Sequence, residues 1–224
     1  MFISSVILKR GPELFNLLKQ KSGSDGYMAH QILWDLFPND GDKKRDFLFH
    51  KDEKGGIPQF LLVSKTEPVE TGGVAVISKS YIPQLIKGQK LAFSLVANPV
   101  VSRKVEGKKH SVKHDVWMDA KKQAKEDRAN TVSIVQACEN ASKSWLIRQG
   151  ERCGFSLKET DVLIDGYIQY RFYKGRKAKL IQYSSIHYEG LLTVTDAEKF
   201  IKMLYTGIGR SKAFGCGLML VRRI

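Results

Sequence analysis

Stretches typical of β-strands alternate with stretches typical of α-helices along most of this chain, and this alternation limits the folds open to it. Strand-like runs are rich in β-branched and aromatic residues, and they occupy Phe2–Leu8, Arg45–Lys51, Gln59–Ser64, Lys90–Ser102, Tyr167–Tyr173, Lys179–Tyr188, Leu191–Val194 and Gly217–Arg222. Apolar residues recur at helical spacing in Tyr27–Phe37, Thr131–Gln149 and Asp196–Tyr205. Strands separated by helices in this way predict an α+β fold made of βαββαβ units.

The length of 224 residues suits one large domain or two small ones, at roughly 100 to 200 residues per domain. We expect two tandem ferredoxin-like (RRM-like, βαββαβ) domains, the first over residues 1–88 and the second over 89–224. The second is the better defined, whereas the fourth strand of the first is not fixed by the pattern. Residues Gly72–Lys90 could hold that strand, a short helix, or both.

A strong positive charge indicates the kind of partner. Thirty-seven Lys and Arg against 23 Asp and Glu give a net charge of +14 and an isoelectric point of about 9.7, which favour a polyanion. Nucleic acid is the first choice, because no apolar run approaches the ~20 residues that span a bilayer. The basic residues also do not gather on one amphipathic helix. At the N-terminus the charge follows the apolar run instead of preceding it as in a signal peptide, so we expect a cytoplasmic protein with no membrane partner.

Several kinds of site are not predicted. The cysteines Cys138, Cys153 and Cys216 are odd in number and form no C-x-x-C pair, so they indicate neither a disulfide framework nor a zinc site. His110 and His114 lie four apart, but in a stretch that is typical of a loop. No phosphate-binding loop of the G-x-x-x-x-G-K-[ST] type occurs. We therefore expect no metal and no cofactor.

Candidate catalytic residues lie in the first turn of the helix that begins at Tyr27. At about 100° per residue the apolar residues share one face, and His30 lies toward the edge of the opposite face with Tyr27 three residues before it. RNA carries its own nucleophile, the 2′-hydroxyl. Its cleavage needs only a base, an acid and positive charge on the phosphorane. Histidine titrates near neutrality and suits the proton transfer, while a tyrosine can position or share a proton.

Two further stretches are candidates for binding phosphate. The glycine-rich C-terminal loop places Gly207, Gly209, Arg210, Ser211 and Lys212 where uncovered backbone N–H groups can approach a sugar-phosphate chain, although a tight turn that closes a sheet is the alternative. A predicted basic hairpin carries Arg171, Lys174, Arg176, Lys177 and Lys179 around a glycine, with a solvated turn as its alternative. The charged segment Arg103–Arg128 is expected to include a mobile loop and is typical of an RNA-contacting arm.

Several motifs in order along the chain resemble the CasE-type CRISPR RNA endoribonucleases of the type I-E Cascade complex. The motifs are Tyr27-x-x-His30-x-x-Leu-Trp-x-Leu-Phe-Pro38, Arg45-Asp-Phe-Leu-Phe49, Ala97-Asn-Pro99, His114-Asp-Val116, Glu189-Gly-Leu-Leu-Thr-Val194 and the terminal glycine loop. The resemblance implies metal-independent cutting at the base of a CRISPR repeat hairpin and a 2′,3′-cyclic phosphate product. It further implies retention of the crRNA beside other Cascade subunits, with the family's Tyr and His at Tyr27 and His30. Some members have Arg after the His where this chain has Gln31, so the source of phosphate-stabilising charge stays open.

Two rival functions are also compatible with parts of the sequence. A non-catalytic RNA-binding subunit on the same tandem fold would have no need of His30. A metal-dependent nuclease would need clustered carboxylates, for which Asp161 and Asp165 are a thin case.

Overall fold

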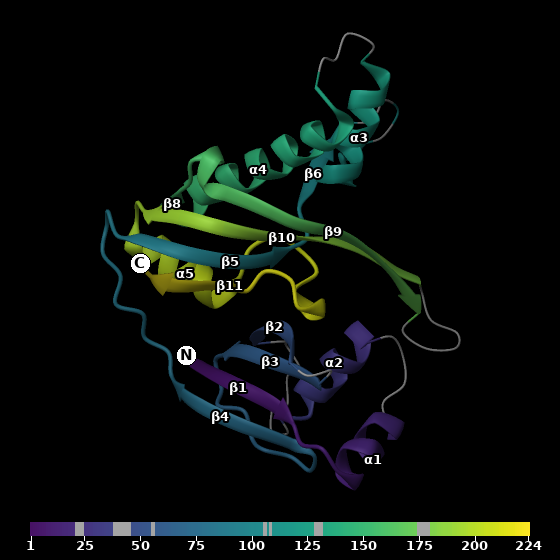
Figure 1. Cartoon of the computed structure of the whole chain (residues 1–224), viewed down its shortest axis with the longest axis vertical. Helices are drawn as coiled ribbons and strands as arrows, with labels where there is room; N and C mark the ends of the chain where they lie inside the picture. The colour runs from purple at the N-terminus through teal and green to yellow at the C-terminus, as the bar shows by residue number, and fades with distance from the viewer. Residues whose placement is uncertain are drawn as a thin grey trace.

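The computed structural model describes residues 1–20, 25–37, 46–54, 57–104, 107, 109–127, 132–173 and 180–224. Within these residues the chain forms a mixed α/β fold with one large antiparallel sheet in each half and a small two-stranded sheet besides. The two halves lie one above the other, and the segment after β4 connects them along one side (Figure 1).

The N-terminal sheet has the strand order β2-β3-β1-β4, with every neighbouring pair antiparallel. Its strands are β1 Phe2–Leu8, β2 Phe47–Lys54, β3 Ile57–Ser64 and β4 Val74–Ser80. The strand that the sequence left open is thus β4. The nine residues between β3 and β4, all described, contain no helix, because they are few and include Pro68, Gly72 and Gly73.

Both helices of this half lie between β1 and β2: α1 spans Pro12–Gln20 and α2 spans Asp25–Trp34. The predicted apolar face of α2 is confirmed, since Ala29, Ile32 and Leu33, with Leu36 just beyond the helix, are buried against the sheet. The sequence reading missed α1. Its segment is short and its apolar residues were not recognised as a helical repeat.

The C-terminal sheet has the order β11-β5-β10-β8, and β9 also pairs with β10. Its strands are β5 Lys90–Ala97, β8 Phe155–Ser156, β9 Val162–Tyr173, β10 Leu180–Val194 and β11 Met219–Arg223. The runs predicted as separate strands on either side of Gly190 form one strand, β10. A Cβ at Gly190 would lie 2.0 Å from the carbonyl oxygen of Asp161, which explains the glycine within a paired strand.

Two long helices complete the core of this half. Helix α4 (Ile134–Cys153) and helix α5 (Ala197–Thr206) bury Trp145, Leu146, Phe200 and Leu204 against the sheet. The short 3-10 helices η1 and η2 span Glu159–Asp161 and Lys212–Phe214. The ribbon of β9 and β10 extends beyond β5, since β5 pairs with β10 only from Ile186 to Thr193 (Figure 1).

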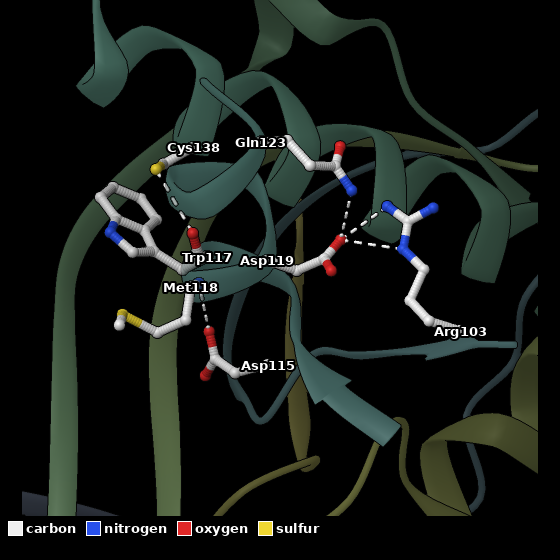
Figure 2. Close-up of polar contacts among 7 residues, drawn as sticks. All are labelled: Arg103, Asp115, Trp117, Met118, Asp119, Gln123 and Cys138. Carbon is white, nitrogen blue, oxygen red and sulfur yellow. Dashed lines mark hydrogen bonds and ion pairs between the residues drawn. The ribbon is translucent and has the colours of Figure 1, made fainter. Parts of the chain in front are cut away.

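The charged segment Arg103–Arg128, which was expected to include a mobile loop, also contains regular elements. Strand β6 (Val100–Arg103) pairs with β7 (Val112–Asp115), and helix α3 (Val116–Glu126) follows directly. Asp115 caps α3 by accepting the backbone N–H of Met118 at 2.8 Å, and Asp119 accepts from both Arg103, at 2.6 Å, and Gln123, at 3.0 Å (Figure 2). The sequence reading did not predict β7 or α3, because charged residues dominate this segment. The expected loop falls partly on residues 105, 106 and 108, which lie outside the described residues.

A third hydrophobic cluster joins the two halves. It buries Leu48 and Val63 of the N-terminal sheet against Leu218 of the C-terminal half. The hydroxyl of Tyr205 on α5 donates to the carbonyl oxygen of Tyr81 at 3.0 Å. Apolar packing and a hydrogen bond therefore hold the two halves against each other.

Candidate active site and RNA-binding surface

Helix α2 presents three ring side chains at the junction of the two halves. The indole Nε1–H of Trp34 donates to Nε2 of His30 at 2.9 Å, and the His30 ring lies 6.3 Å from that of Tyr27, centroid to centroid. Because Nε2 accepts this hydrogen bond, the proton of the neutral imidazole is assigned to Nδ1, which is a buried atom. His30 and Trp34 are one helical turn apart, so the helix itself fixes this contact.

The next side chain along α2 after His30 is Gln31, at the position where some members of the resembled family have Arg. Gln31 is half-buried, and its Oε1 has no hydrogen-bond partner among the described residues. It therefore adds no positive charge beside the imidazole.

The glycine-rich loop of the other half reaches α2. Phe214 in η2 lies 6.3 Å from the His30 ring, with the two planes tilted by 57°. Ser211, at the start of η2, has a φ of 55°, a left-handed conformation that is uncommon for a residue with a side chain. The structure thus brings together the first predicted catalytic residue and the C-terminal loop.

Two glycines of this loop are required by close packing. A Cβ at Gly207 would lie 2.9 Å from both the Gly217 carbonyl oxygen and the Leu48 side chain, and a Cβ at Gly217 would lie 2.6 Å from the carbonyl oxygen of Ile208. Lys212 donates from Nζ to the carbonyl oxygens of Thr206, at 2.6 Å, and Gly207, at 2.9 Å. Its amine therefore links the middle of the loop to the loop's start, just after α5.

A row of aromatic rings leads from His30 along the C-terminal sheet. Phe214 stacks on Tyr183 of β10 at 5.1 Å, and Tyr183 stacks on Tyr170 of β9 at 4.6 Å. Phe172 meets both Phe214 and Tyr183 edge to face. Burial raises the pKa of the Tyr183 hydroxyl well above its ordinary value, so this tyrosine stays neutral across the physiological range.

An open cavity of about 700 Å³ lies beside this row, and three residues of the predicted RNA-binding set line it: Arg171, Arg210 and Ser211. Arg171 on β9 and Arg210 in the glycine loop are both exposed. Gly209 and Gly207 belong to the same loop, one residue and three residues before Arg210.

The remaining members of the predicted basic hairpin are Lys174, Arg176, Lys177 and Lys179, and all lie outside the described residues. The strands that flank them are described. Tyr173 of β9 pairs with Leu180 of β10, so the two strands run antiparallel up to this point.

Sequence reasoning missed two ring partners of His30. Trp34 had a detectable signal, because it lies four residues after His30 on the same helix. Phe214 had none, since its contact depends on how the two halves pack.

The described residues contain no cluster of three or more His, Cys, Asp or Glu that could hold a metal ion. Among the same residues, no helix is long and apolar enough to cross a membrane.

Comparison with known proteins gives consistent matches over the whole chain. The chain is 34% identical over 224 residues to the CRISPR system Cascade subunit CasE of Escherichia coli (strain K12), with 98% of each chain covered. It is 32% identical over 177 residues to the CRISPR-associated endoribonuclease Cse3 of Thermus thermophilus, covering 73% of this chain and 72% of that protein.

Solved structures agree with these matches. The crystal structure of the CRISPR-associated protein Cas6e from Escherichia coli K-12 matches with a TM-score of 0.59 and 26% identity, with 100% of each chain covered. Cse3 bound to a 19-nucleotide RNA shares the fold, with a TM-score of 0.70 and 24% identity over 99% of this chain and 100% of that one. A family model described as CRISPR associated protein matches residues 1–223. The chain therefore belongs to this family of CRISPR-associated proteins.

Proposed function

We propose that this protein is an endoribonuclease that cleaves CRISPR precursor transcripts at the base of the repeat hairpin and stays bound to the mature crRNA as a Cascade subunit. The observation that carries the proposal is the position of His30, on a helix of one half and against the glycine-rich loop of the other, in a chain of net charge +14. Relatives at 34% and 32% identity are named as a Cascade subunit and as an endoribonuclease.

Each half is proposed to be a ferredoxin-like domain, residues 1–88 and 89–224. The strand order supports this assignment. When the two-residue strand β8 is left out and the strands of each large sheet are numbered in chain order, both sheets have the order second-third-first-fourth, as β2-β3-β1-β4 and as β9-β10-β5-β11. The first domain departs from a full βαββαβ unit because it has no helix between its third and fourth strands.

The proposed reaction needs no metal and no cofactor. The 2′-oxygen attacks the adjacent phosphorus, the bond from phosphorus to the 5′-oxygen breaks, and the products end in a 2′,3′-cyclic phosphate and a 5′-hydroxyl. One proton leaves the 2′-hydroxyl and one reaches the 5′-oxygen. His30 transfers a proton, Trp34 holds its ring and Tyr27 positions the reacting groups.

Binding is proposed to rest mainly on phosphate contacts, because the major groove of duplex RNA is too deep and narrow for side chains to read. The proposed contacts are the basic residues and the glycine loop: Arg171, Lys174, Arg176, Lys177, Lys179, Gly207, Gly209, Arg210, Ser211 and Lys212. The bond of Lys212 to two backbone carbonyls gives it a structural role as well. The proposed partners are a CRISPR repeat RNA hairpin and other Cascade subunits, and the proposed location is the cytoplasm.

The test is incubation of the purified protein with the CRISPR repeat RNA of its source genome in excess EDTA. A single cut at the base of the hairpin supports the proposal. Tight hairpin binding without any cut would favour the non-catalytic binding subunit instead, and the absence of both binding and cleavage would refute both functions.

A further inference from the structure

The cavity beside the aromatic row has features that phosphate contacts with a stem do not explain. This open cavity has a volume of about 700 Å³, within the roughly 300–1,000 Å³ of sites for small organic ligands. A flat surface for duplex RNA needs no such hollow. Its walls come from strand ends β5 and β7, from β9 and β10, and from the glycine loop.

Charge at the rim fits a phosphate. Lys113, Arg171 and Arg210 line the cavity and all three are exposed, whereas Asp115 is the one acidic residue in the lining. The cations come from three separate segments, β7, β9 and the loop after α5, so the fold gathers them from positions far apart in sequence. An anionic group is therefore favoured at the mouth of the cavity.

Polar groups line the cavity's deeper side. Asn98 is 5% exposed and donates from Nδ2 to the carbonyl oxygen of Ser184 at 2.6 Å, and the Ser184 hydroxyl donates to Asp115. Asp115 is also held by the Met118 N–H (Figure 2). A carboxylate that is fixed in this way keeps further lone pairs and suits a ligand edge that carries N–H donors.

Aromatic rings supply a stacking platform. Among the described ring contacts, the stack of Phe214, Tyr183 and Tyr170 ends at Tyr170, which also lines the cavity. A nucleic acid base that stacks on Tyr170 would continue this series. The other end of the stack touches His30, so the cavity and the proposed catalytic residue belong to one surface.

From these features we propose that the cavity binds one unpaired nucleotide of the RNA that flanks the hairpin stem next to the cut, with its base on Tyr170 and its phosphate at Lys113 and Arg210. The occupant is unpaired because a base within the stem is already stacked and has its edge paired. This inference rests on the proposed function and adds a subsite for single-stranded RNA to it.

The experiment couples changes in protein and RNA. Repeat RNA that carries a 2′-deoxy residue at the cut is bound by the full-length protein, and each flanking base in turn is replaced by an abasic residue. We expect one abasic position beside the stem to weaken binding at least about fivefold, which corresponds to the lower end of base–aromatic stacking. The same abasic residue should not weaken RNA binding by the Tyr170→Ala variant any further. It should weaken binding by the Tyr170→Phe variant as much as it does for the wild type.

Lys113→Ala provides a second test that leaves the aromatic stack intact. In the wild type, an uncharged methylphosphonate at that same nucleotide should weaken binding, and in Lys113→Ala it should weaken binding no further. Lys158 is an exposed lysine outside the cavity, so Lys158→Ala should respond to the methylphosphonate as the wild type does. The subsite would be overturned if the Tyr170→Ala and Lys113→Ala variants lost the same affinity for RNA with flanking nucleotides as for the bare hairpin. An abasic scan in which no position weakens binding would also overturn it. If the wild type cleaves all-ribose RNA but the RNA modifications have the same effect on the variants as on the wild type, the subsite alone is refuted. If the wild type neither binds nor cleaves the RNA, the proposed function is refuted.

Discussion

Phe214 and His30 lie ring against ring across the junction of the two halves, with centroids 6.3 Å apart. One residue belongs to the loop that precedes the last strand, and the other to the second helix. The proposed active site is therefore built by tertiary packing, and its chemistry depends on the hydrophobic cluster that joins the halves.

Replacing His30 by alanine should abolish cleavage and leave affinity for the repeat hairpin within a few-fold of wild type. The side chain is assigned to proton transfer and not to RNA binding. Single-turnover cleavage and equilibrium binding, measured on the same RNA, check this. Near wild-type cutting by the variant would remove His30 from the mechanism. Tyr27→Phe should be milder, since positioning is its proposed role.

Trp34→Phe should slow cleavage by about one to two orders of magnitude, because the imidazole loses the hydrogen bond that orients it. RNA affinity and thermal stability should stay close to wild type, since the ring that packs on Phe47 is retained. Single-turnover rates across a pH series provide the readout. A variant that matches wild type at every pH would show that the Trp34–His30 bond has no catalytic role.

Substituting hydrogen for the 2′-hydroxyl just upstream of the cut should stop the reaction, because that hydroxyl is the proposed nucleophile. With all-ribose RNA, full activity is expected in EDTA, and the upstream product should end in a cyclic phosphate. Mass spectrometry of the products distinguishes cyclic from linear phosphate. Continued cleavage of the deoxy substrate would contradict this mechanism.

Removing the charges of Lys174, Arg176, Lys177 and Lys179 together should weaken RNA binding and flatten its dependence on salt. Each phosphate contact that is lost should reduce the log–log slope by roughly 0.7 to 0.9. Cleavage at saturating enzyme should survive better than affinity. The measurement is RNA affinity over a series of salt concentrations for the wild type and the quadruple variant. An unchanged log–log slope would show that these residues form a solvated turn that does not contact the RNA.

Acidification should destabilise the fold in part through His50 on β2. Burial is the main cause that lowers the pKa of His50 from 6.5, the nearby His187 lowers it further, and Asp52 opposes the shift. Below pH 6.5 the unfolded chain therefore binds a proton that the folded chain does not, and stability falls with pH until the lowered pKa is reached.

Urea unfolding between pH 7.5 and 5 measures this effect of pH. His50→Gln should show a shallower loss of stability, and His110→Gln, which changes an exposed histidine, should keep the wild-type slope. A His50 variant whose stability falls as steeply as the wild type's would contradict this assignment.

Regular patterns made part of this structure predictable. The buried face of α2 followed from Ala29, Ile32 and Leu33 at helical spacing, and β10 and α5 were found near their observed positions. Tyr27 and His30 could be singled out because a chemical requirement, proton transfer without a metal, matched two residues on the same helix, although that helix begins at Asp25 and not at Tyr27 as predicted.

Other features depended on contacts between distant residues. Helix α3 was missed because it lies in a highly charged segment, and its Asp115 cap and the Arg103–Asp119 ion pair are not evident from the sequence pattern. The contact of Phe214 with His30 and the cavity between Asn98, Lys113 and Arg210 arise only when separate strands and loops pack together. No local pattern encodes these juxtapositions.

The order in which the chain is synthesised matters for a site divided in this way. Helix α2 leaves the ribosome before Phe214 and the loop around it, because it lies earlier in the chain. A nascent chain that has folded only its first half would carry His30 without its ring partner from the second half. If the proposed site needs both partners, chains that terminate before Phe214 should be inert toward cellular transcripts.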